Sequence, residues 1–212
     1  MRFWNRGEPK EYAVSWAGLA RQRRRGELLA CLQKEAAEFT PDDLDVMMVR
    51  YDAKIAGLPA EYRAELARYA RVQIPEGYNR LMTAVLDEVH AKEKLRPEWK
   101  VFVRAAERAC SKGTPGDRFR SLKYVIAAFA MFVLDEPGHP VGMPFPGGLC
   151  VERYEGVVYC PVREAWADVD EALCGFCPAR QSRERDMVLS RDERDLLGRE
   201  EKLTNYFYNF KG

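Results

Sequence analysis

The chain has 212 residues, 47% of them hydrophobic, and its 34 basic and 33 acidic side chains leave a formal net charge of +1. A chain of this length buries on the order of 70% of its unfolded surface, so its core needs no disulfide bonds for stability. The balanced charge is not the strongly basic footprint of a dedicated nucleic-acid-binding protein, so we do not expect nucleic acid as the partner.

The start of the sequence and its longest apolar run bear on localisation. The first eight residues become charged at once, without an apolar stretch before a cleavage site, so we expect no secretory signal and a cytoplasmic protein. Residues 122–134 form the longest apolar run, which Lys123 interrupts and which is shorter than the ~20 residues that cross a bilayer. We interpret this run as a buried helix and expect no membrane association.

A dense basic run precedes the first well-defined helix, which we expect over residues 27–39. The run consists of Arg21, Arg23, Arg24 and Arg25. Most such runs are solvated faces, and contact with RNA or DNA is the alternative hypothesis.

Helical periodicity continues to about residue 136. Thr40 followed by Pro41 is typical of a helix start and predicts a helix that ends near Gly57. We expect the next helix to stop before Pro75, because proline lacks the backbone N–H group that a helix interior requires. A separate helix should then carry a buried apolar stripe made of Tyr78, Met82, Val85 and Val89.

Two further helices complete the predicted bundle. The first follows Pro97 and has one apolar face, which comprises Trp99, Phe102, Val103, Ala106 and Cys110. The second covers residues 119–134 and is apolar on nearly every side, as expected for the central helix of a bundle.

The character of the chain changes at Pro137, where prolines and glycines end the helical pattern. Two strand-like runs follow, with Glu155 and Gly156 between them, and they predict a β-hairpin. A two-residue loop would place Val151 opposite Cys160, whereas a three-residue loop that includes Tyr154 would place Cys150 there. We favour the three-residue loop, because it brings both thiols to one face.

Four of the six cysteines gather in this region, namely Cys150, Cys160, Cys174 and Cys177. A cluster of thiols in an intracellular chain is typical of a metal or iron–sulfur site. Structural zinc is the favoured interpretation, an iron–sulfur cluster is the alternative, and free or redox-active thiols are the third possibility. No catalytic residues are predicted from the sequence.

The remaining candidate ligands are weaker. Cys31 and Cys110 lie on apolar helix faces and are interpreted as small buried hydrophobic residues, with Cys110 as the substitute ligand if Cys150 does not bind. His139 stands in the rigid loop directly before the cysteines, and it is a candidate ligand or cofactor-binding residue.

Several short motifs resemble a known family. His139-Pro140-Val141-Gly142, the loop of residues 144–148, Tyr159-Cys160-Pro161-Val162 and the stretch of residues 173–177 are similar to the signature of DUF2115 (UPF0305-like), an uncharacterised archaeal family of methanogens. The resemblance implies the cytoplasm of an anaerobic host that is rich in iron–sulfur proteins. It covers Cys160, Cys174, Cys177 and His139, and it implies no activity.

The expected architecture is mainly α, with about six helices in a bundle. We predict an α-helical bundle over residues 1–136, a cysteine-rich loop and hairpin module over residues 137–180, and a charged helix with an aromatic tail over residues 181–212. The metal would lock the module onto the bundle and present a surface to a protein partner. A redox or cluster-handling protein is the rival hypothesis.

Overall fold

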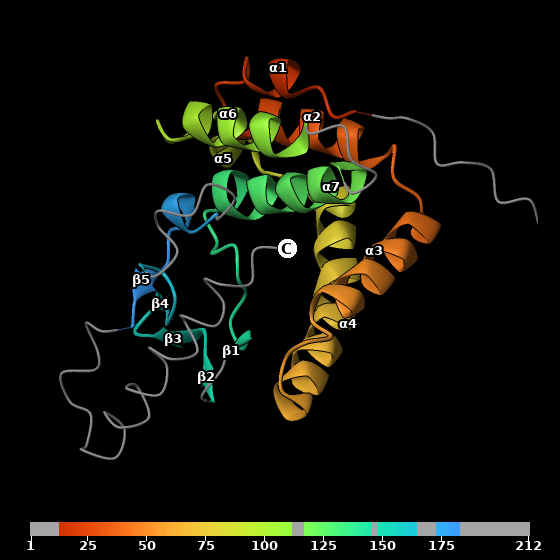
Figure 1. Ribbon diagram of the computed structural model, residues 1–212. Coiled ribbons are helices and arrows are strands. Elements are labelled where there is room, and N and C mark those ends of the chain that lie inside the picture. Colours follow the sequence, from red (N-terminus) through yellow and green to blue (C-terminus); the bar gives the residue numbers. More distant parts are fainter. Residues whose placement is uncertain (1–12, 112–116, 146–147, 165–172, 183–212) are drawn as a thin grey trace, which may run out of the picture.

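The computed structural model describes residues 13–111, 117–145, 148–164 and 173–182. Within these ranges, helices predominate, as the sequence predicts. The α-helices are α1 (Trp16–Leu19), α2 (Arg25–Ala36), α3 (Pro41–Lys54), α4 (Ala60–Thr83), α5 (Glu88–Lys92), α6 (Trp99–Cys110) and α7 (Asp117–Ala128). Figure 1 shows α1, α2, α6 and α7 stacked together, while α3 and α4 extend away from them as a pair.

The main core lies between α2, α6 and the α7 segment. The predicted apolar face of α6 is confirmed, since Trp99, Phe102, Val103 and Ala106 are buried in this core. The Phe102 ring lies 5.8 Å from that of Tyr124 and 5.1 Å from that of Phe132, centroid to centroid. Aromatic side chains of this size contribute much of the burial that stabilises a small core.

The central helix is confirmed as well. Helix α7 passes into a π-helical turn, η1 (Phe129–Val133), in which nearly every side chain is buried. A turn of this kind contains i→i+5 hydrogen bonds, here from the Leu134 N–H group to the Phe129 carbonyl at 3.1 Å.

The start of α3 agrees with the predicted cap. The Thr40 hydroxyl accepts a hydrogen bond from the Asp43 N–H group at 3.3 Å, and the Asp43 carboxylate accepts one from the Thr40 N–H group at 2.8 Å. This reciprocal pair is a capping box, which satisfies two backbone donors that the first helical turn leaves open. The pattern of Thr40 and Pro41 therefore fixed the start of the helix correctly.

The prediction of a break before Pro75 was wrong, because α4 continues through this residue to Thr83. The helix contacts α2, α3, α7 and β1 along its length. Proline within a helix removes one backbone hydrogen bond and costs about 3 kcal/mol. The contacts on several sides of α4 offset this cost. Gly77 lets the helix approach α7 closely, since a Cβ atom there would lie 3.1 Å from Ile126.

The predicted apolar stripe beyond Met82 was also wrong. Val85 is 90% exposed and Val89 is 73% exposed. Asp87 begins the short helix α5 and accepts hydrogen bonds from the N–H groups of Val89 and His90, both at 2.9 Å. Helix α4 ends at Thr83 with Ala84 extended, so Val85 lies outside any helix and Val89 belongs to α5, which has no buried residue.

Helices α3 and α4 enclose a small core of their own. It is formed by Ile55, Leu58 and Leu66, with Tyr62 and Met143 packed against it. The side chains of this cluster are distinct from the main core between α2, α6 and α7. We call the pair of helices and this cluster the arm.

Five short strands follow the helices. They are β1 (Pro144–Phe145), β2 (Leu149–Cys150), β3 (Glu152–Tyr154), β4 (Val157–Cys160) and β5 (Arg180–Gln181). Strands β1 and β2 pair antiparallel, and β4 pairs antiparallel with β3 and parallel with β5. Figure 1 shows the strands and the arm on the same side of α7, and β1 contacts α4.

The β3–β4 hairpin is confirmed, but the favoured three-residue loop is wrong. Tyr154 pairs with Val157, which leaves Glu155 and Gly156 as a two-residue loop. Both loop residues have positive φ angles, 47° and 81°, as a type I′ turn requires. This turn matches the right-handed twist of paired strands, and its register places Val151, rather than Cys150, opposite Cys160.

Two expectations concern the rest of the chain. In the described part, no helix combines the length and the hydropathy that crossing a bilayer requires. The predicted charged helix and aromatic tail of residues 181–212 lie almost entirely outside the described residues. The proposed division into domains therefore stays a prediction.

Asp43 gives the fold a testable acid sensitivity. Hydrogen bonds from Arg118 at 2.8 and 3.1 Å hold the pKa of the buried Asp43 carboxyl below its usual value. The resulting stabilisation is present above the unfolded pKa of about 3.9 and is lost as pH falls through the lower folded pKa. Between about pH 6 and pH 2, we expect the urea midpoint of Asp43→Asn to decrease less than that of the wild type. The exposed neighbour variant Asp42→Asn should keep the wild-type slope, and equal slopes in both variants would contradict this account.

Candidate functional site

Three cysteines lie where the strands meet the last described segment. Cys160 ends β4, Cys174 begins the 3-10 helix η2 (Cys174–Phe176), and Cys177 directly follows it. After Cys177 the chain forms β5, which pairs with β4 so that Gln181 lies beside Cys160. Cys177 packs against the small cluster of Val151, Cys160 and Ala179, which brings the turn close to Cys160. We call Cys160, Cys174 and Cys177 the thiol site.

A network of hydrogen bonds fixes the two chain segments of the thiol site to each other. The Arg163 Nε group donates to the carbonyls of Cys177 and Ala179, both at 3.2 Å. The Gln181 side chain donates to the Pro161 carbonyl at 2.9 Å, and its own oxygen accepts from the Glu164 N–H group. The backbone around the three cysteines is therefore held from both sides.

The three thiols influence one another electrostatically. Burial raises the pKa of Cys160 to about 12, and the nearby Cys174 and Cys177 add to the rise, whereas a hydrogen bond from the Val162 N–H group and the charge of Arg163 oppose it. Burial and the charge of Cys177 likewise raise the pKa of Cys174. The neighbouring thiolates thus disfavour the ionisation of Cys160 and Cys174, and a soft cation between the sulfurs would reverse this repulsion.

The turn between Cys174 and Cys177 is anchored to the helical core. The Phe176 ring packs edge-on against Phe102, with the centroids 5.3 Å apart. The Arg96 Nη2 group donates to the Phe176 carbonyl at 2.9 Å. The thiol site is therefore joined to the core through the residue directly before Cys177.

Cys150 lies apart from these three. It belongs to β2 and pairs with Pro144. Burial raises the pKa of Cys150, and the charges that add to the rise are those of Glu152 and of Glu65 on α4. The adjacent Val151 packs against Cys160 and Ala179, and consecutive residues of an extended chain point to opposite sides. The structure thus brings together three of the four predicted thiols and turns Cys150 toward the arm.

His139 lies in the loop after η1. Its ring is 5.5 Å from that of Phe145 in an edge-on arrangement. Burial and the charge of Lys123 lower the pKa of His139 to about 4, so the imidazole is neutral at neutral pH. The following loop is tied to the arm, because the Tyr69 hydroxyl lies 3.2 Å from the Pro140 carbonyl and 3.3 Å from that of Val141.

The other cysteines lie in the helical part. Cys110 is buried in the main core and Cys31 is half-buried against it, in agreement with their interpretation as small apolar residues. All six cysteines are within the described residues, and none forms a disulfide bond.

The donor chemistry of the thiol site suits zinc or iron, but the side chains do not yet enclose an ion. Among the described residues, no three His, Cys, Asp or Glu side chains are arranged to hold a metal. The predicted metal site of Cys150, Cys160, Cys174 and Cys177 therefore stays a prediction. Metal binding would require the sulfurs of the thiol site to turn toward a common point.

Sequence reasoning missed two arginines. Arg163 and Arg96 both donate to carbonyls of the segment that carries Cys177. Arg163 follows Cys160 by three residues, so its proximity to a candidate ligand was a usable signal. Arg96 is 78 residues before Cys174 in the sequence, and no local pattern points to it.

Comparison with known proteins identifies the family of the chain. Residues 24–182 match the family described as "Uncharacterized protein conserved in archaea (DUF2115)". The chain belongs to this archaeal family. The DUF2115 region begins at the residue before α2 and ends after β5, so it contains all six cysteines and His139. The resemblance inferred from the sequence motifs is thereby confirmed.

Relatives of this DUF2115 protein come from methanogens. A UPF0305 protein of Methanothermobacter thermautotrophicus is 31% identical over 160 residues, which cover 73% of this chain and 94% of the relative. A UPF0305 protein of Methanocaldococcus jannaschii is 28% identical over 156 residues, which cover 71% of this chain and 92% of the relative. A shorter match to a UPF0305 protein of M. thermautotrophicus reaches 54% identity over 54 residues, which are 26% of this chain and 35% of that protein. No solved structure matches the chain.

Proposed function

We propose that this DUF2115 protein binds one soft metal ion at the thiol site, with structural zinc favoured. The observation that carries the proposal is the packing of Cys177 against the cluster that contains Cys160, at the place where β5 pairs with β4. The nearby Cys174 and Cys177 also raise the pKa of Cys160. Neighbouring thiolates repel one another, but a divalent cation that binds all of them neutralises their charge and removes this repulsion.

The surrounding groups support thiolate ligation. The Val162 N–H group hydrogen-bonds to the Cys160 sulfur, and Arg163 brings a positive charge to both Cys160 and Cys174. Groups of this kind orient metal ligands and disperse their negative charge. The bound ion would hold the Cys174–Cys177 turn on the end of β4, so its contribution would be to folding and not to chemistry.

The proposed fourth ligand differs from the Cys150 that the sequence suggested. Cys150 lies against the arm, where Glu65 and Glu152 affect its pKa. We therefore propose that the fourth ligand is His139 or an external group. The imidazole of His139 is neutral at neutral pH, which is the form that binds a metal.

An iron–sulfur cluster is the second candidate. Cys160 and Cys177 are both followed by proline, a pattern also found among ferredoxin ligands. The relatives from methanogens support an anaerobic setting, in which such clusters are stable. With a cluster in place of zinc, the protein would have a redox or cluster-handling role.

For the wider role, we propose an accessory protein of the archaeal cytoplasm that binds a protein partner. The metal would keep the cysteine segment docked on the bundle, so that the strands and the arm present one fixed surface. Contact with nucleic acid through the basic run is not supported, because Arg24 donates to the Lys92 carbonyl at 2.6 Å and Arg25 pairs with Glu93 at 3.1 Å.

Elemental analysis of protein purified without oxygen tests the proposal. We expect one equivalent of zinc and no visible absorption. Iron and sulfide with broad visible absorption would instead establish the cluster. The variant Cys150→Ser should retain the metal in full, while Cys160→Ser should lose it. Metal-free protein, or equal metal loss in both variants, would contradict the three-thiol site.

A further inference from the structure

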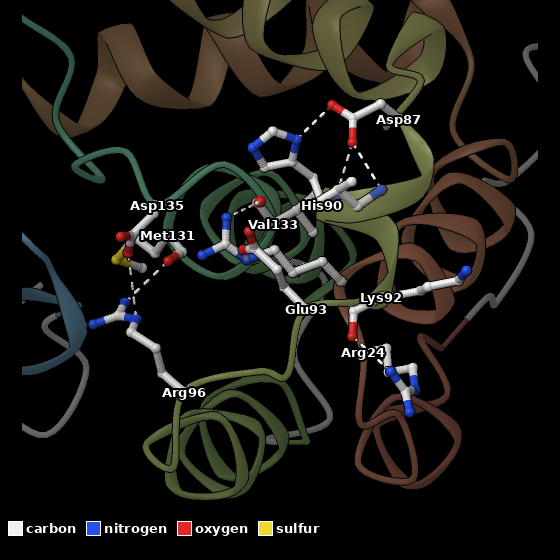
Figure 2. Close-up of polar contacts among 11 residues, drawn as sticks. Arg24, Asp87, His90, Lys92, Glu93, Arg96, Met131, Val133 and Asp135 are labelled. Carbon is white, nitrogen blue, oxygen red and sulfur yellow. Dashed lines mark hydrogen bonds and ion pairs between the residues drawn. The ribbon is translucent and has the colours of Figure 1, made fainter.

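The end of the α7–η1 helix is capped by two arginines. The last carbonyls of a helix have no partner within it and need donors from elsewhere. Arg96 donates to the Met131 carbonyl at 2.9 Å, and Arg25 donates to the Val133 carbonyl at 3.3 Å (Figure 2). Both arginines thereby satisfy the same helix end.

Arg96 makes further contacts that Arg25 does not. Its Nη2 group also donates to the Phe176 carbonyl, and its Nε group lies 3.5 Å from the Asp135 carboxylate. Its guanidinium stacks 4.9 Å from the centroid of the Phe132 ring. The planar group is thus held on the helix by Phe132 and Asp135, and one of its nitrogens bridges two carbonyls.

The second of these carbonyls lies inside the cysteine motif. Phe176 stands between Cys174 and Cys177, and its ring packs on Phe102 of α6. The side chain and the backbone of Phe176 are therefore fixed to the core at two points. The positions of the two flanking sulfurs depend on this attachment, because each lies within two residues of it.

We infer that Arg96 is a positioning residue for the thiol site, an inference that rests on the proposed metal binding. It holds the backbone of the Cys174–Cys177 turn on the helical core, so that only the sulfur-bearing side chains have to turn when the ion binds. A turn that is ordered in advance binds more tightly, since less conformational entropy is lost on binding. Arg96 itself does not touch the metal.

The test compares Arg96→Met with Arg25→Met, since both remove a cap from the same helix end. Zinc affinity is measured by competition with a chromophoric chelator, and the stability of the metal-free protein is measured by urea unfolding. We expect Arg96→Met to weaken zinc binding by about 10- to 100-fold, as loss of an outer-shell contact does. Arg25→Met should lower stability but keep the wild-type zinc affinity.

The conservative variants extend the comparison. Arg96→Lys keeps one donor near the two carbonyls and should recover part of the zinc affinity, while Arg25→Lys should match the wild type. If Arg96→Met does not fold, this second pair decides the question. Unchanged zinc affinity in a folded Arg96 variant, with wild-type protein that binds zinc, would overturn the role of Arg96. Wild-type protein that binds no zinc would instead overturn the proposed function.

Discussion

Replacing Cys174 with serine is expected to remove the metal and to destabilise the protein in one step. A serine hydroxyl is a poor ligand for zinc, and metal affinity contributes directly to the free energy of folding. We expect a loss on the order of 4 kcal/mol, which lowers the melting temperature by ~10 °C in a chain of this size. Thermal unfolding and elemental analysis of the same sample measure both effects.

Cys31→Ser provides the matched control for this variant. It makes the same chemical change on α2, where Cys31 is half-buried and distant in sequence from the thiol site. The control should keep its metal and melt near the wild-type temperature. If Cys174→Ser retains both its metal content and its melting temperature, the thiol site does not hold an ion.

The second large effect is expected for Phe102→Ala. The Phe102 side chain is fully buried and its ring contacts those of Trp99, Tyr124, Phe132 and Phe176. Removal of such a ring leaves a cavity between helices and costs about 3–5 kcal/mol. Urea unfolding should therefore show a lower midpoint with an unchanged slope.

The neighbouring residue Val101 supplies the comparison. It lies on the same helix and is 46% exposed. Val101→Ala should change the free energy of unfolding by no more than about 0.5 kcal/mol, as is usual for surface positions. Similar losses in both variants would mean that α6 does not bury its aromatic face in the core.

Local signals in the sequence predicted the elements whose determinants are local. Thr40 and Pro41 fixed the start of α3 because a cap involves residues only three positions apart. The apolar face of α6 was equally clear, since Trp99, Phe102 and Ala106 recur at helical spacing. Both features depend on short segments, which periodicity describes well.

The wrong predictions concern features that depend on contacts between residues far apart in the sequence. Pro75 predicted a break, but packing on α2, α3 and α7 keeps α4 continuous. The hairpin register depended on one residue in the loop, and the positive φ angle of Glu155 is not evident from its side chain. The observed register places Val151, and not Cys150, opposite Cys160, while Cys160, Cys174 and Cys177 come close together.

The contribution of Arg96 had no sequence signal at all. It joins three segments that are far apart along the chain, namely its own loop, the end of η1 and the Cys174–Cys177 turn. A residue of this kind is identified only when the fold is known. The motif of two cysteines marks where an ion would bind, but the contacts that shape the motif lie outside it.

The separate small core of the arm has a consequence for how this molecule fluctuates. The core of the arm is small, since its buried residues are Ile55, Leu58 and Leu66. Local unfolding of the outer half of α3 and α4 therefore costs less free energy than unfolding of the helices around Phe102. Partial opening of these two helices would leave the rest of the molecule folded. It would also release the segment that Tyr69 holds at Pro140, so that motion of the arm would extend to the loop that precedes the strands and the thiol site.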